Sequence, residues 1–277
     1  MQIRLFAFDL DGTILHSQHA LSPRNAQALR LAHEQGVEIV PATGRMRSFL
    51  PPSIAELPFI RYIVSSNGAA VYDRKADRVL YENMMSGALA EHCFDIVAPY
   101  RVFSEVYVNG EAYTDRSMWE RRETEFGYPA ERIAFMKNKK YNIVEDFRTF
   151  LRRKDVKVEK YNMPYVPESV FDDMMSFLGK QEDLVVACSG FTNIELNNRT
   201  TSKADGLRGL GELLGIPREA MMTIGDNGND VSMLRYAGLS AAVANASAEA
   251  KAAADVLTDA CTEDGVAKAI EKYILKA

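Results

Sequence analysis

Short apolar runs alternate with amphipathic stretches over the first eighty residues of the chain. The runs at 3–8, 37–42 and 62–64 are almost continuously hydrophobic, which is typical of strands buried on both faces of a parallel sheet. Between the first two runs, the Ser-Pro pair at 22–23 begins a predicted helix that ends at Gly36. We therefore expect strand–helix units that build a parallel sheet.

The pattern changes between residues 83 and 190, where runs of charge and most of the aromatic residues occur. Helical patterns alternate there with strand-like runs, which predicts an α+β unit inserted into the first domain. From residue 191 the strand–helix alternation resumes. The predicted strands of this last part are 193–196, 221–224 and 240–243. The fold class expected is α/β, a Rossmann-like doubly wound parallel sheet made from residues 1–82 and 191–277, with the inserted domain at 83–190.

Composition and charge narrow the class of protein. The chain has 277 residues, of which 47% are hydrophobic and 26% are charged, as in ordinary globular proteins. The 33 basic and 38 acidic residues give a net charge of −5, which argues against nucleic acid as a partner. Three cysteines without metal or disulfide spacing suit a reduced compartment. We expect a cytoplasmic protein that is not membrane-bound, with a monomer as the simplest state.

Polar segments with a common chemistry follow the predicted strands. In an open α/β sheet the ligand site lies beyond the carboxyl ends of the strands, so these segments are expected to meet. They are Asp9-Leu10-Asp11-Gly12-Thr13, Thr43-Gly44-Arg45, Ser66-Asn67-Gly68 and Gly225-Asp226-Asn227-Gly228-Asn229-Asp230, with Lys203 at the start of a predicted helix.

These side chains suit a phosphate and a divalent cation. Four carboxylates, from Asp9, Asp11, Asp226 and Asp230, would repel one another in a small space unless a cation offset their charge. Oxygen ligands of this kind favour Mg²⁺. The Thr43-Gly44 pair and the Lys203 ammonium would supply the donors and the positive charge that a phosphoryl group needs.

Each segment taken alone has a plainer interpretation. The first could be a turn rich in Asp and Gly, Thr43 could cap a strand end, and Lys203 could be a solvated helix start. The six-residue segment at 225–230 is harder to explain as a capped turn. The order of the segments, each at the end of a strand or the start of a helix, favours one functional site.

In this order the segments resemble the motifs of the haloacid dehalogenase-like phosphohydrolases, specifically the Cof-type subfamily with a large C2B-type α/β cap. The resemblance covers nearly the whole chain. Asp9 to Thr13 is similar to the first motif, Thr43-Gly44-Arg45 to the second, Lys203 to the third and Gly225 to Met233 to the fourth. One departure is that Ala204 and Asp205 follow Lys203, where the family commonly has Gly directly after the lysine.

The resemblance implies a role for each matching residue. Asp9 would be the nucleophile that forms an aspartyl-phosphate, and Asp11 the general acid and then the general base. The implied Mg²⁺ ligands are the carboxylates of Asp9 and Asp226 and the backbone carbonyl of Asp11. The residues implied to hold phosphate or substrate are Thr43, Gly44, Lys203 and Asn229, with Arg45 facing the substrate or the cap. Asp230 and Asn227 would support the metal ligands, and Asp230 would also hold Lys203.

The resulting expectation is a Mg²⁺-dependent phosphatase that acts on a small phosphorylated metabolite, such as a sugar phosphate, under the inserted cap. Two alternatives stay open. A phosphosugar mutase resembling phosphomannomutases would use the same aspartyl-phosphate, and a sensor would bind phosphometabolites without turnover. The presence of both Asp9 and Asp11 argues against the sensor, which needs neither a nucleophile nor an acid.

Overall fold

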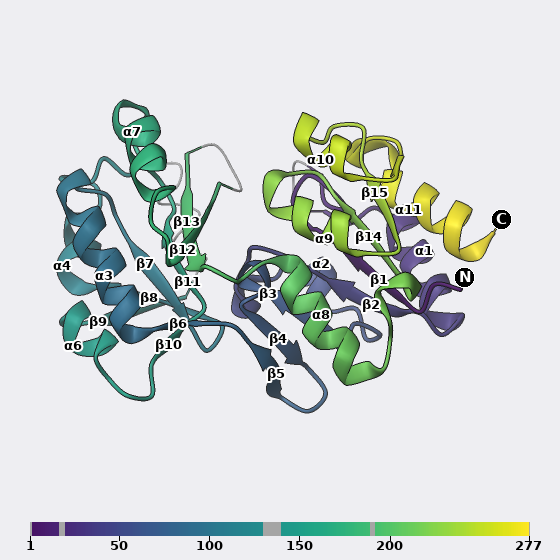
Figure 1. Ribbon diagram of the computed structural model, residues 1–277, viewed down its shortest axis with the longest axis horizontal. Coiled ribbons are helices and arrows are strands. Elements are labelled where there is room, and N and C mark those ends of the chain that lie inside the picture. Colours follow the sequence, from purple (N-terminus) through teal and green to yellow (C-terminus); the bar gives the residue numbers. More distant parts are fainter. Residues whose placement is uncertain (1, 17–19, 130–139, 189–191, 277) are drawn as a thin grey trace. The chain divides into compact units, whose positions relative to one another are not determined.

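The computed structural model describes residues 2–16, 20–129, 140–188 and 192–276, and its chain divides into two compact units (Figure 1). Each unit is made from segments that are distant in the sequence. Unit 1 contains residues 1–45, 50–82 and 202–277, and unit 2 contains residues 46–49 and 83–201.

Unit 1 is built on a parallel sheet with the strand order β16-β15-β14-β1-β2. An isolated parallel bridge between Ala42 and Val64 continues it from β2 to β3 (Tyr62–Ser65). The strands of the sheet are β1 (Leu5–Phe8), β2 (Glu38–Pro41), β14 (Met221–Gly225), β15 (Leu239–Ala242) and β16 (Val256–Leu257). The direction in which successive strands are added reverses between β1 and β14. That point is where doubly wound sheets bind their ligands.

Helices cover both faces of this sheet. Alternate residues of β1 point to opposite faces, and the apolar side chains on each face pack against helices. Phe6 and Phe8 pack in one apolar cluster with α1 and α11, and Leu5 and Ala7 pack in another with α8 and α9. The Ser22 side chain caps α1 by accepting from the Asn25 amide. The helices of unit 1 are α1 (Pro23–Glu34), α2 (Pro52–Ala55), α8 (Lys203–Leu214), α9 (Val231–Tyr236), α10 (Ala248–Ala253) and α11 (Gly265–Ile270). The predicted doubly wound α/β fold is confirmed.

A small antiparallel sheet of β3, β4 (Ala70–Asp73) and β5 (Arg78–Glu82) completes unit 1. The last two strands form the hairpin that the sequence predicts. Asp73 lies at its turn with only 2% of its surface exposed. Its carboxylate accepts hydrogen bonds from the Arg61 guanidinium, at 2.8–3.2 Å, and from the amides of Lys75 and Ala76.

Unit 2 is an α+β unit with a six-stranded sheet in the order β12-β13-β11-β7-β8-β9, in which the β8–β9 pair is parallel and the other pairs are antiparallel. One face is apolar and packs with α3, α6 and α7. The strands, with those of a separate β6–β10 pair, are β6 (Met85–Ser86), β7 (Glu105–Val108), β8 (Glu111–Asp115), β9 (Tyr141–Val144), β10 (Lys157–Val158), β11 (Lys160–Met163), β12 (Leu184–Ala187) and β13 (Ile194–Asn198). The helices are α3 (Gly87–Val97), α4 (Arg116–Arg121), α6 (Phe147–Leu151) and α7 (Glu168–Leu178).

Short helical turns connect these elements in both units. The 3₁₀ turns are Arg47–Phe49, Ser66–Gly68, Ala98–Tyr100, Arg218–Ala220, Gly228–Asp230 and Cys261–Glu263, and a π-helical turn spans Glu271–Leu275. Within the part of the chain that the structure describes, no helix combines the length and the apolar character needed to cross a bilayer.

The predicted domain bounds need correction at residues 46–49 and 191–201, which both belong to unit 2. The sequence placed residues 191–201 in the first domain, whereas β13 pairs with β11 and β12 in the sheet of unit 2. The physical reason is the alternation along β13, where Glu195 and Asn197 share one face and Ile194 and Leu196 the other. A strand covered by helices on both faces would be apolar throughout. The predicted division between residues 190 and 191 itself lies outside the described residues.

We expect Asp73→Asn to lower the free energy of unfolding by about 1–2 kcal/mol near neutral pH, because a buried ionic acceptor is lost. The Arg61 guanidinium, helped by the Ala76 and Lys75 amides, lowers the pKa of Asp73 to about 2 against the opposing effect of burial. A group with a lowered pKa stabilises the fold above its unfolded pKa and loses that effect as the pH falls. Urea unfolding should therefore show the difference shrinking from about pH 4 towards about pH 2.

The matched control is Asp155→Asn. Asp155 pairs with Arg153 at 2.6 Å on the surface, where both side chains are more than half exposed, so we expect no measurable change. Equal losses of unfolding free energy in Asp73→Asn and Asp155→Asn would contradict the role given to the Asp73 carboxylate. So would a loss in Asp73→Asn that does not depend on pH.

Candidate functional site

Three carboxylates meet at the carboxyl ends of β1 and β14, the two strands between which the sheet order reverses. Asp9 directly follows β1, and its amide donates to the Ile224 carbonyl of β14 at 3.0 Å. Asp9, Asp226 and Asp230 each offer a carboxylate oxygen, and these oxygens all lie within 4.8 Å of one another. The sheet thus brings together residues that are more than two hundred positions apart in the sequence.

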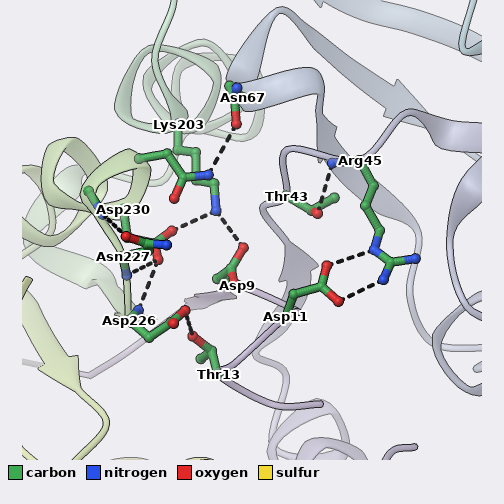
Figure 2. Close-up of polar contacts among 12 residues, drawn as sticks. Asp9, Asp11, Thr13, Thr43, Arg45, Asn67, Lys203, Asp226, Asn227 and Asp230 are labelled. Atoms are coloured by element: carbon green, nitrogen blue, oxygen red, sulfur yellow. Dashed lines mark hydrogen bonds and ion pairs between the residues drawn. The ribbon is translucent and has the colours of Figure 1, made fainter. Parts of the chain in front are cut away.

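The buried ammonium of Lys203 holds this cluster together. Figure 2 shows its Nζ between Asp9 and Asp230, at 2.5 Å from Asp9 Oδ1 and 2.6 Å from Asp230 Oδ1. Lys203 begins α8 and its side chain is fully buried. The second oxygen of Asp230 accepts from the amides of Asp226, at 2.9 Å, and Asn227, at 3.0 Å. Asp230 therefore both pairs with Lys203 and shapes the loop that carries Asp226.

The protonation of these groups reflects burial and charge crowding. Burial raises the pKa of Asp9 well above its ordinary value, since the attraction of Lys203 does not fully offset desolvation and the nearby Asp230 and Asp226 charges. Burial and the Asp230 charge likewise raise the pKa of Asp226 to about 6. Burial alone would lower the pKa of Lys203, but the Asp230 and Asp9 carboxylates outweigh it and raise the value. Lys203 is therefore charged at neutral pH.

The first loop reaches Asp226 because it contains a glycine. Gly12 has φ +82°, and a Cβ at this position would lie 2.6 Å from the Asp226 Oδ2 atom, so any other residue would strain the backbone and displace either the loop or the Asp226 carboxylate. Next to it, the Thr13 hydroxyl donates to Asp226 Oδ1 at 2.8 Å. The Asn245 side chain donates to the Gly12 carbonyl at 2.8 Å and accepts from the Cys261 amide.

The Thr43-Gly44-Arg45 turn follows β2 at the same edge of the sheet. Thr43 is buried, and its hydroxyl accepts from the Arg45 amide at 3.1 Å. Its carbonyl accepts from the Asn67 amide at 3.0 Å, so that the turn is tied to the loop after β3. In that loop Ser66 and Asn67 have φ of 52° and 61°, a left-handed conformation that is uncommon for residues other than glycine.

This second loop also contacts the helix that carries the lysine. A Cβ on Gly68 would lie 2.0 Å from the Ser202 carbonyl oxygen, so only glycine allows this close approach. The Asn67 side chain accepts from Asn229 at 3.2 Å, which joins the Ser66-Asn67-Gly68 segment to the fourth predicted motif. Asn67 thus combines a strained backbone with a side chain that contacts Asn229 of the site. Strained backbone of this kind occurs at functional positions.

Arg45 and Asp11 are joined to each other in the structure. The guanidinium of Arg45, which the sequence predicts to face the substrate or the cap, forms a bidentate ion pair with the Asp11 carboxylate, with Nε to Oδ2 at 2.7 Å and Nη2 to Oδ1 at 2.6 Å (Figure 2). Both residues lie in unit 1, and the fork of the guanidinium matches the two carboxylate oxygens.

Ala204 and Asp205, which follow Lys203 where a glycine is commonly found, leave the start of α8 regular. The Ser202 side chain caps the helix by accepting from the Asp205 amide at 3.1 Å. The Asp205 carboxylate accepts from the Tyr81 hydroxyl of β5 at 2.6 Å. Ala204 and Asp205 therefore occupy positions where their side chains fit, and the lysine keeps its place.

The donor set fits a small divalent cation. The groups that could ligate a metal are all carboxylate oxygens, which Mg²⁺ prefers, and those of Asp9, Asp226 and Asp230 lie within 4.8 Å of one another. Asp9 and Asp226 are the residues best able to hold such a cation. Asp230 is already engaged with Lys203 and two backbone amides.

The sequence indicated no specific role for three residues of the site, Thr13, Asn67 and Asn245. Thr13 and Asn67 stand inside segments that attracted attention, but their pairing with Asp226 and Asn229 depends on the fold. Asn245 carries no local signal beyond its position after a strand, since its partners at Gly12 and Cys261 are distant in the sequence.

A family model for haloacid dehalogenase-like hydrolases matches residues 6–270 of the chain. The 5-amino-6-(5-phospho-D-ribitylamino)uracil phosphatase YcsE of Bacillus subtilis strain 168 is 28% identical over 99% of this chain and 97% of its own. The phosphatase YwpJ of the same organism is 29% identical over 96% and 98%. A solved haloacid dehalogenase-like hydrolase from B. subtilis superposes with a TM-score of 0.82 at 27% identity, covering 97% of this chain and 99% of that one.

We expect Asp226→Asn to stabilise the metal-free protein by about 1 kcal/mol, because it removes a partly buried charge that repels its neighbours. A carboxyl whose pKa rises on folding from 3.8 to about 6 weakens the fold as the pH rises through that interval. The gain should therefore be full above about pH 6 and small below about pH 4. Urea unfolding in EDTA measures it.

The same variant should lose most of the stabilisation that excess MgCl₂ gives the wild type. The matched control is Asp259→Asn, which changes a half-exposed carboxylate paired with Lys268 in the same unit. A destabilised Asp226→Asn protein in EDTA, or an unchanged response to MgCl₂, would contradict this account of the cluster.

Proposed function

Because the chain belongs to the haloacid dehalogenase-like hydrolases, we propose that it is a Mg²⁺-dependent phosphatase that hydrolyses a small phosphomonoester through an aspartyl-phosphate on Asp9. The predictions of this family, of the fold class and of an enzyme of the haloacid dehalogenase phosphatase type are confirmed by the family match and the relatives. The observation that carries the proposed mechanism is the buried Lys203 ammonium between Asp9 and Asp230. It supports the proposal because the Asp9 carboxylate lies beside a positive charge of the kind that a phosphoryl group requires.

In the first step, a carboxylate oxygen of Asp9 attacks phosphorus and forms an acyl-phosphate bond. The bond between phosphorus and the ester oxygen breaks with its electron pair on that oxygen. Asp11, protonated at this stage, gives its proton to the departing oxygen, so that an alcohol leaves.

In the second step, water attacks the phosphorus of the aspartyl-phosphate. The Asp11 carboxylate takes a proton from the water, and the bond between phosphorus and the Asp9 oxygen breaks. Asp9 is restored as a carboxylate and inorganic phosphate is released, with Asp11 again protonated for the next cycle.

Other residues of the site orient the phosphate during both steps. Lys203 stabilises the charge on the phosphoryl oxygens, and the Thr43 hydroxyl and the Gly44 amide are the donors proposed to hold them. Asn229 extends this set from the loop after β14, where its side chain is already oriented by Asn67. Asp230 keeps Lys203 charged and in place.

Mg²⁺, held by the Asp9 and Asp226 carboxylates and the Asp11 carbonyl, would offset the charge between nucleophile and phosphate when bound. The crowding of carboxylates described above supports this assignment. Asn227 contributes through its amide, which donates to Asp230 behind the Asp226 ligand.

Recognition of the organic part of the substrate is proposed for unit 2 in the role of a cap. Its sheet carries polar side chains on β7, β11 and β13 that are buried and paired with one another, with Lys160 Nζ 2.9 Å from Glu195 Oε1 and Asn162 Nδ2 2.7 Å from Glu105 Oε1. A few fixed polar groups of this kind are what a site for a small metabolite uses. One relative is named for a phosphoribityl compound, and we propose a substrate of that general class, handled by a monomeric enzyme.

The test is Mg²⁺-dependent release of phosphate from a panel of sugar phosphates, nucleotides and an aryl phosphate. We expect release with MgCl₂, its loss in EDTA, and a fall of at least about 1,000-fold in Asp9→Asn, since the nucleophile is removed. Asp155→Asn, on the surface of unit 2, should keep the wild-type rate and serves as the matched control.

The alternatives give different outcomes in the same experiment. Conversion of a phosphosugar into its isomer without release of phosphate would overturn hydrolysis in favour of the mutase. Tight binding of a panel member without turnover, unchanged by Asp9→Asn, would overturn catalysis in favour of a sensor.

A further inference from the structure

We propose that Arg45 is a positioning residue for Asp11 rather than a ligand of the substrate phosphate. The inference rests on the proposed function, in which Asp11 exchanges protons with the leaving oxygen and with water. It assigns Arg45 a role different from the one that its motif suggests.

The first argument is the geometry of the ion pair. The two contacts, at 2.7 and 2.6 Å, use both carboxylate oxygens of Asp11 and two nitrogens of one guanidinium. Two parallel hydrogen bonds fix the carboxylate against rotation, which a single contact does not. Each oxygen accepts one of them and keeps a second lone pair, on which the proton of the acid form is carried. The Arg45 side chain is only 14% exposed, whereas that of Asp11 is 42% exposed. The arginine is therefore the rigid member of the pair.

The second argument is the way in which the backbone of Arg45 is held. Its amide donates to the Thr43 hydroxyl at 3.1 Å, and its carbonyl accepts from the Ser66 amide at 3.0 Å. These bonds fix the residue on both sides, between the turn after β2 and the loop after β3. The guanidinium thus extends from a point that two strand ends define.

The third argument concerns the place of Asp11 in the chain. It follows β1 in a loop whose backbone turns at once, with the Gly12 amide donating to the Leu15 carbonyl at 3.2 Å. Its side chain is 42% exposed, and an acid–base group loses rate when it is misoriented by as little as about 1 Å. The ion pair with Arg45 restrains the orientation of the Asp11 carboxylate.

The fourth argument is that another cation already lies beside the nucleophile. In Figure 2 the Lys203 side chain points to Asp9 and Asp230, whereas the Arg45 side chain points to Asp11. The two basic residues therefore serve different carboxylates. Holding the phosphate falls to Lys203, and orienting the acid–base group falls to Arg45.

The test separates positioning from phosphate binding by three measurements on Arg45→Ala. With a sugar phosphate as substrate, we expect kcat to fall by about 10–100-fold with KM nearly unchanged. With an aryl phosphate whose phenolate leaves without a proton, the loss in the burst of phenol release should be much smaller. Arg45→Lys keeps the charge but lacks the fork, so it should recover only part of the rate.

A double-mutant cycle gives the second measurement. If Arg45 acts through Asp11, then Arg45→Ala should cause no further loss in a protein that already carries Asp11→Asn. A cost that persists undiminished in the Asp11→Asn background would overturn the inference.

The third measurement does not require turnover. Inorganic phosphate, titrated calorimetrically with MgCl₂ present, should bind Arg45→Ala as tightly as the wild type, whereas loss of a phosphate ligand would weaken binding by about 10-fold or more. Arg24→Ala is the matched control, because Arg24 forms a bidentate pair with Glu271 on the surface of the same unit. Thermal unfolding verifies that each variant is folded.

Failure of this inference is distinguishable from failure of the proposed function. If the wild type releases phosphate but Arg45→Ala raises KM and weakens phosphate binding, Arg45 is a substrate ligand and the proposed function stands. If the wild type neither releases nor binds phosphate, the proposed function is overturned, and the role of Arg45 falls with it.

Discussion

The ion pairs of the buried Lys203 are the contacts on which the organisation of the site depends. An ammonium removed from water is costly unless carboxylates surround it, and here Asp9 and Asp230 do so at 2.5 and 2.6 Å. The same carboxylates would repel each other without the lysine. Neither the ammonium nor the carboxylates are stable in the interior alone. Asp9 after β1, Asp230 in the fourth motif and Lys203 in α8 therefore require one another.

The architecture of the sheet explains why these groups meet. The carboxyl ends of β1 and β14 are neighbours at the point where the strand order reverses. Gly12 and Gly68 then allow the loops to approach Asp226 and Ser202 more closely than a side chain would permit. A site with crowded charges and a strained backbone at Ser66 and Asn67 is maintained by the surrounding core, as is common where stability is exchanged for function.

The strand at 194–198 and the partner of Arg45 show what a local sequence pattern leaves undecided. The strand at 194–198 looks like any short strand after an irregular segment, and its membership of unit 2 depends on pairing with β11 and β12. Arg45 follows a recognisable turn, yet its partner Asp11 is thirty-four residues earlier. A local pattern identifies a strand or a basic residue, but it does not identify the distant segment with which that strand or residue pairs.

The amino-acid sequence by itself determined the α/β class, the parallel sheet and the set of chemical groups at its edge, because burial periodicity and the residues after each strand are local properties. The tertiary structure alone decided which charges pair. It placed Lys203 between Asp9 and Asp230, joined Thr13 to Asp226 and Asn67 to Asn229, and gave Arg45 to Asp11. The physical reason is that a hydrogen bond between distant segments depends on ångström-scale distances, and those are set only when the whole sheet has packed.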